Sequence, residues 1–136
     1  MKIGFYPMVA DILHAGHVIA LEEAKKHCDY LIVGLNCVPS YKTPVQSIYE
    51  RFMQLRGVKW VDEIVPYDDQ CIELILSSLQ YDIYFLGEDY LGKPFSGKDI
   101  VLKRHKQIHY LERQHNISSS SVKKSIIDNF HSVNDT

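Results

Sequence analysis

The stretch Asp11-Ile12-Leu13-His14-Ala15-Gly16-His17 decides the fold, because it joins an apolar run at residues 2–6 to an amphipathic pattern at 18–28. A strand that passes directly into a helix brings the unsatisfied N–H groups of the helix start to the end of the strand. These groups and the helix dipole favour phosphate, and Gly16 lets a phosphate approach the backbone. His14 and His17 add donors that can follow charge during phosphoryl or nucleotidyl transfer. We interpret the stretch as a reaction centre rather than as one capping and one incidental surface histidine.

The rest of the chain alternates between apolar runs typical of strands and patterns typical of helices. Further strands are predicted at residues 31–36, 61–65, 81–86 and 107–111, with Pro7 ending the first strand and Pro66 the third. Helices are predicted at residues 47–58, 68–79, 98–104 and 122–130. This order predicts an α/β, Rossmann-like single domain, a five-stranded parallel sheet with helices on both faces. Ligands bind such sheets beyond the carboxyl ends of the strands, so the loops there should meet on one rim.

Composition excludes several function classes. The 136 residues are 46% hydrophobic and 24% charged, which suits one domain with a real core. The net charge of −2 gives no support for nucleic-acid or membrane partners, and no apolar stretch is long enough to span a bilayer. Cys28, Cys37 and Cys71 match neither a zinc pattern nor a disulfide framework, and Cys28 and Cys71 are expected in apolar helical patterns. A cytoplasmic location is the expectation.

Four motifs occur in one order along the chain. They are the stretch at residues 11–17; Tyr49-Glu50-Arg51 with Trp60-Val61-Asp62-Glu63-Ile64; Gly87-Glu88-Asp89-Tyr90; and Arg113 with Ile117-Ser118-Ser119-Ser120-Ser121. In this order and spacing the chain resembles the small cytidylyltransferases of the nucleotidyltransferase superfamily, above all the glycerol-3-phosphate cytidylyltransferases. The resemblance implies a nucleotidyltransferase domain at residues 1–125, followed at 126–136 by the end of the C-terminal helix and a polar tail.

The resemblance also implies a reaction, in which CMP passes from CTP to a small phosphorylated alcohol such as glycerol 3-phosphate and pyrophosphate is released. Magnesium is expected with CTP because a triphosphate must be neutralised, and no protein residue is assigned as a metal ligand. The catalytic residues implied are His14, His17 and Arg113. Nucleotide-binding residues, besides these three, are Val9, Ala10, Gly16, Lys42, Gly87, Asp89, Ile117, Ser118, Ser119 and Ser120. Asp11 and Arg51 are implied to bind the acceptor.

Each assignment has a structural alternative. The serine run fits a helix N-cap, Arg51 a surface ion pair, Asp89 a turn cap, Lys42 a solvated loop lysine and Asp11 a turn-forming residue. The chain also departs from the family pattern, because Met8-Val9-Ala10 replaces the usual Gly-Thr-Phe and removes a threonine hydroxyl. No lysine lies between Pro66 and Gln80, where glycerol-phosphate enzymes often hold the phosphate of the acceptor. Acceptor identity is therefore left open.

Two other functions compete with cytidylyl transfer. One is adenylyl or guanylyl transfer to a sugar phosphate, which Asp89-Tyr90 favours; the other is non-catalytic nucleotide binding, which the missing threonine and lysines favour. CTP is preferred because a pocket bounded by Tyr90 and the Arg113 segment is expected to leave little room for a purine. A homodimer is expected from the resemblance and from four apolar residues beyond the needs of one small sheet, unless all four are intramolecular core: Phe52, Trp60, Val61 and Ile64.

Overall fold

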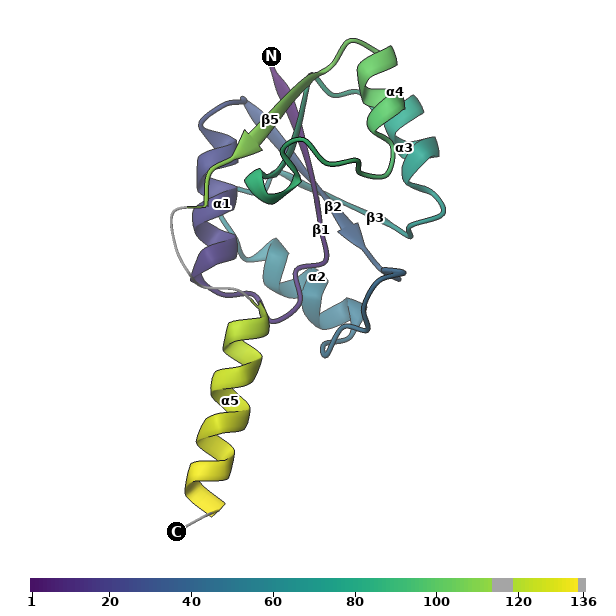
Figure 1. Cartoon of the computed structure of the whole chain (residues 1–136). Coiled ribbons are helices and arrows are strands. Elements are labelled where there is room, and N and C mark those ends of the chain that lie inside the picture. Colours follow the sequence, from purple (N-terminus) through teal and green to yellow (C-terminus); the bar gives the residue numbers. More distant parts are fainter. Residues whose placement is uncertain (114–118, 135–136) are drawn as a thin grey trace.

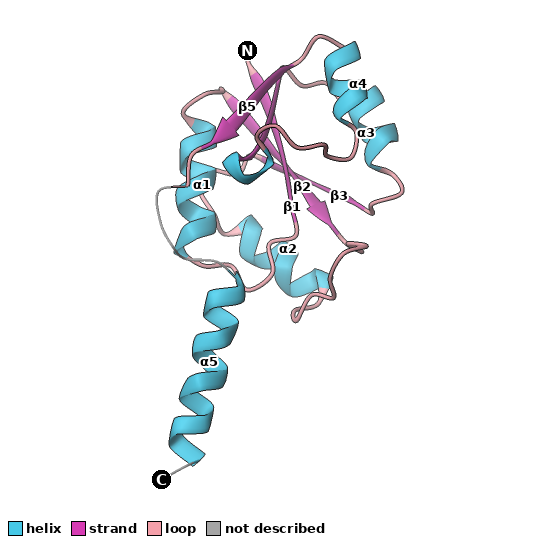
Figure 2. Ribbon diagram, in the orientation of Figure 1, coloured by secondary structure: helices cyan, strands magenta, loops and turns pink. Residues whose placement is uncertain are grey.

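Five parallel strands form one sheet with helices on both faces, in a computed structural model that describes residues 1–113 and 119–134 (Figure 1, Figure 2). The strands are β1 (Ile3–Met8), β2 (Tyr30–Asn36), β3 (Glu63–Tyr67), β4 (Ile83–Gly87) and β5 (Gln107–Leu111). The helices are α1 (Ala15–Lys25), α2 (Ile48–Arg56), α3 (Ile72–Ser78), α4 (Lys98–Lys103) and α5 (Ser119–Asn134), with a 3-10 turn, η1, at Glu88–Tyr90. The predicted α/β, Rossmann-like architecture is confirmed.

Each face of the sheet has its own apolar layer. On one face, Leu21 of α1 and Leu55 of α2 pack against β2 and β4. On the other face, Leu76 of α3 and Val101 of α4 pack against the opposite sides of the same strands and of β1. Residues 31–36 of β2 are all buried, which explains why this strand reads as a continuous apolar run.

The strand order β3-β2-β1-β4-β5 reverses between β1 and β4. β1 pairs with β4 only over Gly4 and Phe5, whereas its pairing with β2 continues to Met8. The strands can approach at Gly4 because a Cβ there would lie 2.5 Å from the ring of Phe85. Beyond Phe5 the two strands are no longer hydrogen-bonded. This creates the kind of crevice in which α/β proteins bind ligands.

The prediction that Pro7 and Pro66 end their strands is wrong, since β1 and β3 both continue through them. Proline lacks the N–H that a strand donates to its neighbour, so it is tolerated where one side of a strand has no partner. Pro7 lies opposite Gly34 of β2, beyond the last residue of β1 that pairs with β4. Pro66 lies in β3, the edge strand, opposite Leu35 of β2.

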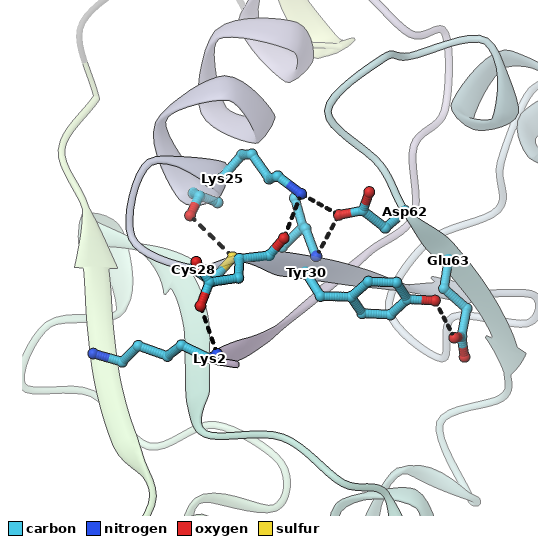
Figure 3. Close-up of polar contacts among 9 residues, drawn as sticks. Lys2, Lys25, Cys28, Tyr30, Asp62 and Glu63 are labelled. Carbon is cyan, nitrogen blue, oxygen red and sulfur yellow. Dashed lines mark hydrogen bonds and ion pairs between the residues drawn. The ribbon is translucent and has the colours of Figure 1, made fainter.

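Polar contacts tie together the edge at which the strands begin (Figure 3). The Lys25 ammonium donates to the Asp29 carbonyl over 2.9 Å and is paired with Asp62. The Asp62 carboxylate also accepts the backbone N–H of Leu31 over 2.8 Å. The Tyr30 hydroxyl donates to Glu63 over 2.7 Å. The Asp62-Glu63 part of the second motif therefore has a structural role at the edge opposite the strand ends that carry the predicted ligand loops.

The four residues proposed for a dimer interface are partly buried against the core on the α1 and α2 face: Phe52, Trp60, Val61 and Ile64. The homodimer stays a prediction.

Cys71 is exposed at the N-cap of α3, so the expectation that it occupies an apolar helical position is wrong. Helix α5 leaves the body of the molecule at its own N-terminal end and projects away from the sheet (Figure 1). Among the described residues, no helix combines the length and the apolar character needed to cross a membrane.

Candidate active site

A pocket of about 780 Å³ lies where β1, β2, β3 and β4 end. Its wall includes six of the residues predicted to bind nucleotide or acceptor: Val9, Ala10, Asp11, His17, Lys42 and Gly87. The rest of the wall is contributed largely by tyrosines and by polar residues of the loops after β2 and β3. The loops after β1, β2 and β4, which were predicted to converge, contribute to this wall, and so does the end of β3, which was not among them. The predicted contribution of the loop after β5 is absent from the described wall.

The loop between β1 and α1 has an unusual backbone. Ala10 and Ile12 adopt left-handed conformations, with φ of 57° and 51°. A β-branched residue rarely adopts this conformation, so Ile12 is strained and must be held by its surroundings. Its N–H donates to Oε1 of Gln46 over 2.7 Å, and the N–H of Leu13 donates to Oε1 of Gln54 over 3.3 Å. The loop after β2 and helix α2 therefore hold the β1–α1 loop in place.

Asp11 lies in the chain between Ala10 and Ile12 and is 1% exposed. Its carboxylate accepts the N–H groups of Val45 and Gln46, each over 2.9 Å, and lies 2.7 Å from the ammonium of Lys123 on α5. Burial alone would raise the pKa of Asp11, but the hydrogen bonds from Lys123, Val45 and Gln46 outweigh burial and lower it to about 2. Asp11 lines the pocket and also joins three segments of the chain.

His14 and His17 fix each other at the start of α1. Nδ1 of His14 accepts the N–H of Gly16 over 3.0 Å, and Nδ1 of His17 accepts the N–H of His14 over 3.2 Å. In a neutral histidine whose Nδ1 accepts, the ring proton lies on Nε2. Both rings are therefore held as Nε2–H donors, with centroids 4.1 Å apart. His17 lines the pocket directly, while Gly16 is buried in the first turn of the helix.

The one lysine of the β2–α2 loop, Lys42, lines the pocket near the same corner. Desolvation lowers the pKa of Lys42, and the neighbouring positive charge of Lys123 lowers it further, while Asp11 acts in the opposite sense. Two cations and one buried carboxylate are thus grouped beside the N-terminus of α1. Lys123 escaped the sequence analysis because the helix carrying it is distant in sequence and no motif includes it.

Arg51 is buried and absent from the described wall of the pocket, and it does not form the surface ion pair considered as an alternative. It is 2% exposed, and its guanidinium donates to the carbonyl oxygens of Val9, Asn36 and Cys37 over 3.0, 2.7 and 3.1 Å. These carbonyls belong to the chain segments that leave β1 and β2. Arg51 therefore holds two loops of the pocket together from the interior of the protein. A comparison of sequence motifs cannot distinguish such a structural arginine from one that contacts a ligand.

The remaining predicted residues lie outside the described wall of the pocket. Arg113 follows β5 at the same edge of the sheet and is exposed, and Asp89 is exposed in η1. Ile117 and Ser118 lie outside the described residues, as do the side chains of Ser119 and Ser120, whose backbone begins α5. The proposed serine cradle therefore stays a prediction.

The sequence analysis also missed the polar and aromatic residues on the β2 and β3 side of the pocket. The helix predicted at residues 68–79 includes Asp68 and Asp69, but α3 begins only at Ile72. Asp68 lies in the turn before it, where it accepts the N–H groups of Gln70 and Cys71 over 2.9 and 3.1 Å. The Asp69 carboxylate faces Asn36 and Ser40 instead. Tyr67 and Tyr84 line the pocket, and burial raises the pKa of both, so their hydroxyls stay protonated. The signal available in the sequence was position alone, at the ends of β2, β3 and β4.

The donor set fits a nucleotide-borne magnesium ion better than a resident metal ion. No group of three or more histidine, cysteine, aspartate or glutamate side chains in the described part of the chain could hold a metal. Magnesium bound to a nucleotide keeps several waters and takes most of its other ligands from phosphate oxygens, so one or two carboxylates suffice. The carboxylate of the pocket wall close to Lys42 is Asp11.

The comparison with known proteins agrees with this geometry. The model of the family described as cytidylyltransferase-like matches residues 5–125. The bifunctional protein HldE of Wolinella succinogenes is 38% identical over 131 residues, which cover 92% of this chain and 27% of HldE. HldE of Campylobacter jejuni is 35% identical over 133 residues, which cover 93% of this chain and 28% of HldE. The chain thus spans about a quarter of the length of these relatives.

Solved structures share the fold at lower identity. The lipopolysaccharide core biosynthesis protein of Thermoplasma volcanium has a TM-score of 0.67 and 22% identity, covering 86% of this chain and 99% of its own. The pantoate-beta-alanine ligase of Francisella tularensis has a TM-score of 0.57 and 17% identity, covering 90% of this chain and 67% of its own. At these identities the likeness concerns the arrangement of strands and helices.

Proposed function

The chain belongs to the cytidylyltransferase-like family and is nucleotidyltransferase-like, and from this premise we propose that it transfers AMP from ATP to a sugar phosphate. The observation that carries nucleotidyl transfer is the pair of histidines held as Nε2–H donors at the start of α1, beside a pocket at the strand ends. His17 and Lys42 together form a corner suited to the phosphates of a nucleotide.

The chemistry needs little covalent participation from the protein. An oxygen of the acceptor phosphate attacks the α-phosphorus, a P–O bond forms, and the bond from that phosphorus to the leaving pyrophosphate breaks. Negative charge grows on the transferring group and on pyrophosphate. The Nε2–H of His17, which lines the pocket, donates to these oxygens, and Lys42 adds positive charge nearby. His14, whose Nε2 is buried, holds the start of α1 beside it. Magnesium carried by the nucleotide supplies further neutralisation.

Three observations bear on the choice of an adenylyl group over the cytidylyl group expected from the motifs. The named relatives at 38% and 35% identity are HldE proteins, and this similarity favours the adenylyl alternative. In addition, the steric argument for CTP loses its basis, because Arg113 is absent from the described wall and the pocket of about 780 Å³ lies in the upper part of the usual range for ligand sites. The Asp89-Tyr90 turn, with Tyr90 on the wall, points the same way.

A product assay tests the proposal. The full chain is incubated with magnesium and equimolar ATP, CTP and GTP, and with an acceptor panel of hexose and heptose phosphates, glycerol 3-phosphate and nicotinate mononucleotide. We expect pyrophosphate release and an ADP-linked sugar as the main product. A predominant CDP-linked product would restore the cytidylyl assignment. Nucleotide binding without pyrophosphate release from any pair would identify a non-catalytic nucleotide-binding protein.

A further inference from the structure

The pocket wall carries groups of opposite charge. His17 lines it beside the start of α1. The Asp69 carboxylate lines it where β2 and β3 finish and is surrounded by Asn36, Ser40 and the hydroxyls of Tyr41 and Tyr67. The Lys42 ammonium lies 5.9 Å from the centre of the Tyr41 ring and close to Lys123. A ligand in the pocket therefore meets both cations and a carboxylate.

The geometry around Asp69 fixes it as an ionised hydrogen-bond acceptor. Its Oδ1 accepts Nδ2 of Asn36 over 2.5 Å, and its Oδ2 accepts the N–H of Ser40 over 2.5 Å. Burial opposes ionisation, but the hydrogen bonds from Ser40 and Asn36 outweigh it, and the pKa of Asp69 is lowered. Two carboxylate oxygens offer about four acceptor positions, so room for ligand donors remains.

Asn36 has the role of a positioning residue. It is 3% exposed, and its amide orientation is determined by Asp69, since a carbonyl oxygen turned toward the carboxylate would be repelled. Its backbone carbonyl is held in turn by the buried guanidinium of Arg51. The Asp69 carboxylate is thus held by a side chain that is itself fixed to the interior.

We propose that Asp69 binds hydroxyl groups of the acceptor, whose phosphate points away from Asp69, toward His17. This inference rests on the proposed transfer to a sugar phosphate and specifies how the sugar is recognised. An ionised carboxylate attracts hydroxyl donors and repels a phosphate, and residues 66–80 contain no lysine that could reverse this. The acceptor end at Asp69 must therefore be uncharged and rich in hydroxyls.

The neighbouring aromatic residues fit such a group. The rings of Tyr84 and Phe95 are stacked, with centroids 5.2 Å apart and an interplanar angle of 7°, and both line the pocket. Flat aromatic faces can cover the C–H surfaces of a sugar while its hydroxyls reach polar partners at the edge. The protonated hydroxyl of Tyr67 adds a donor beside the Asp69 acceptor.

Equilibrium binding tests the inference without requiring turnover. Titration calorimetry compares a panel of aldose 1-phosphates with inorganic phosphate, for the wild-type chain and for Asp69→Asn. The variant should weaken binding of the tightest sugar phosphate by about tenfold or more, as expected for loss of a charged hydrogen bond. Binding of inorganic phosphate should stay the same or tighten, because a negative charge is removed. Asp68→Asn is the matched control and should change neither affinity, since Asp68 holds the turn before α3 and does not line the pocket.

A second comparison avoids reliance on one variant. Removing the recognised hydroxyl, with deoxy analogues of the tightest sugar phosphate, should weaken binding to the wild-type chain by about tenfold and to Asp69→Asn by less than twofold. Equal losses in both chains, or equal weakening of sugar phosphate and inorganic phosphate by the variant, would overturn the inference. So would a panel in which no sugar phosphate binds more tightly than phosphate itself. The two proposals can fail separately. If removal of the hydroxyl weakens binding to the wild-type chain but not to Asp69→Asn, and the wild-type chain never releases pyrophosphate, this inference stands and the proposed function is refuted.

Discussion

The ammonium of Lys123 lies 2.7 Å from Oδ2 of Asp11, and this contact joins the last helix of the chain to its first loop. Residues that are 112 positions apart thus meet beside the start of α1. The side chain of Lys123 is 28% exposed, whereas that of Asp11 is fully buried. Removal of the lysine would leave a buried carboxylate with one partner fewer.

Replacing Lys123 with methionine should lower the free energy of unfolding by about 1–2 kcal/mol, because the buried carboxylate loses a charged hydrogen bond. Urea denaturation measures this change. Hydrogen exchange should also show faster exchange of the α5 amides. Lys124→Met, at an exposed position on the same helix, is the control and should change stability by less than about 0.5 kcal/mol. Equal behaviour of the two variants would contradict the role given to Lys123.

Asp11 should make the stability of the protein depend on pH at the acid end. Its folded pKa of about 2 lies below the ordinary value of 3.8, so the ionised group stabilises the fold above pH 3.8. This stabilisation, up to about 2 kcal/mol, is lost as the pH falls from about 5 toward 2. Asp11→Asn should therefore be less stable than wild type at pH 7, and the difference should shrink in denaturation curves taken down to pH 3. A difference independent of pH would show that Asp11 acts through its shape rather than its charge.

His17 can be tested with two substitutions that separate capping from chemistry. Asparagine can accept the N–H of His14 in place of Nδ1 but has no group at the position of Nε2, whereas alanine lacks both. Both variants should lower kcat by about a hundredfold or more, as should His14→Ala. Only His17→Ala should also lose about 1 kcal/mol of stability, through loss of the cap. Steady-state kinetics and thermal unfolding supply the two readouts, and near-normal turnover in both His17 variants would move the reaction centre elsewhere.

Arg51→Met should destabilise the fold by about 3 kcal/mol or more, because three buried carbonyl oxygens lose their donor. Arg51→Lys should recover little, since a single ammonium cannot span the three carbonyls. Arg56→Met, an exposed arginine in the last turn of the same helix, is the control for charge and should be nearly neutral. Chemical denaturation is the measurement. A stable Arg51→Met chain with a raised KM for the acceptor would reinstate the binding role that the sequence suggests.

Much of the fold could be predicted from local pattern. The apolar run of β2 and the short run at residues 107–111, which is β5, stand out because their neighbours are polar or break the pattern. The helix start at His14 was recognisable because glycine and two histidines follow a strand directly. The prolines misled the prediction, since the tolerance of Pro7 and Pro66 depends on which neighbouring strand is missing. That information belongs to the sheet and is absent from the run of residues.

The pocket was predictable in location and less so in content. Any residue just after a strand reaches the same rim, so Lys42 and Gly87 could be placed there from position alone. The direction in which each side chain points could not be deduced in the same way. Asp68 and Asp69 are adjacent and chemically identical, yet one holds the turn before α3 and the other lines the pocket. Arg51 resembles a ligand contact in sequence, and only its burial among carbonyl groups shows what it holds.

The left-handed backbone at Ala10 and Ile12 has a consequence for the rate at which ligands arrive. The loop acquires its shape when the chain folds, because Gln46, Gln54 and Arg51 hold it in place. The conformational entropy of the loop is therefore lost when the chain folds and not when the nucleotide binds. A preorganised loop needs no slow rearrangement after first contact, so association should be limited by diffusion and orientation, and differences in affinity among phosphates should reside in how fast they leave.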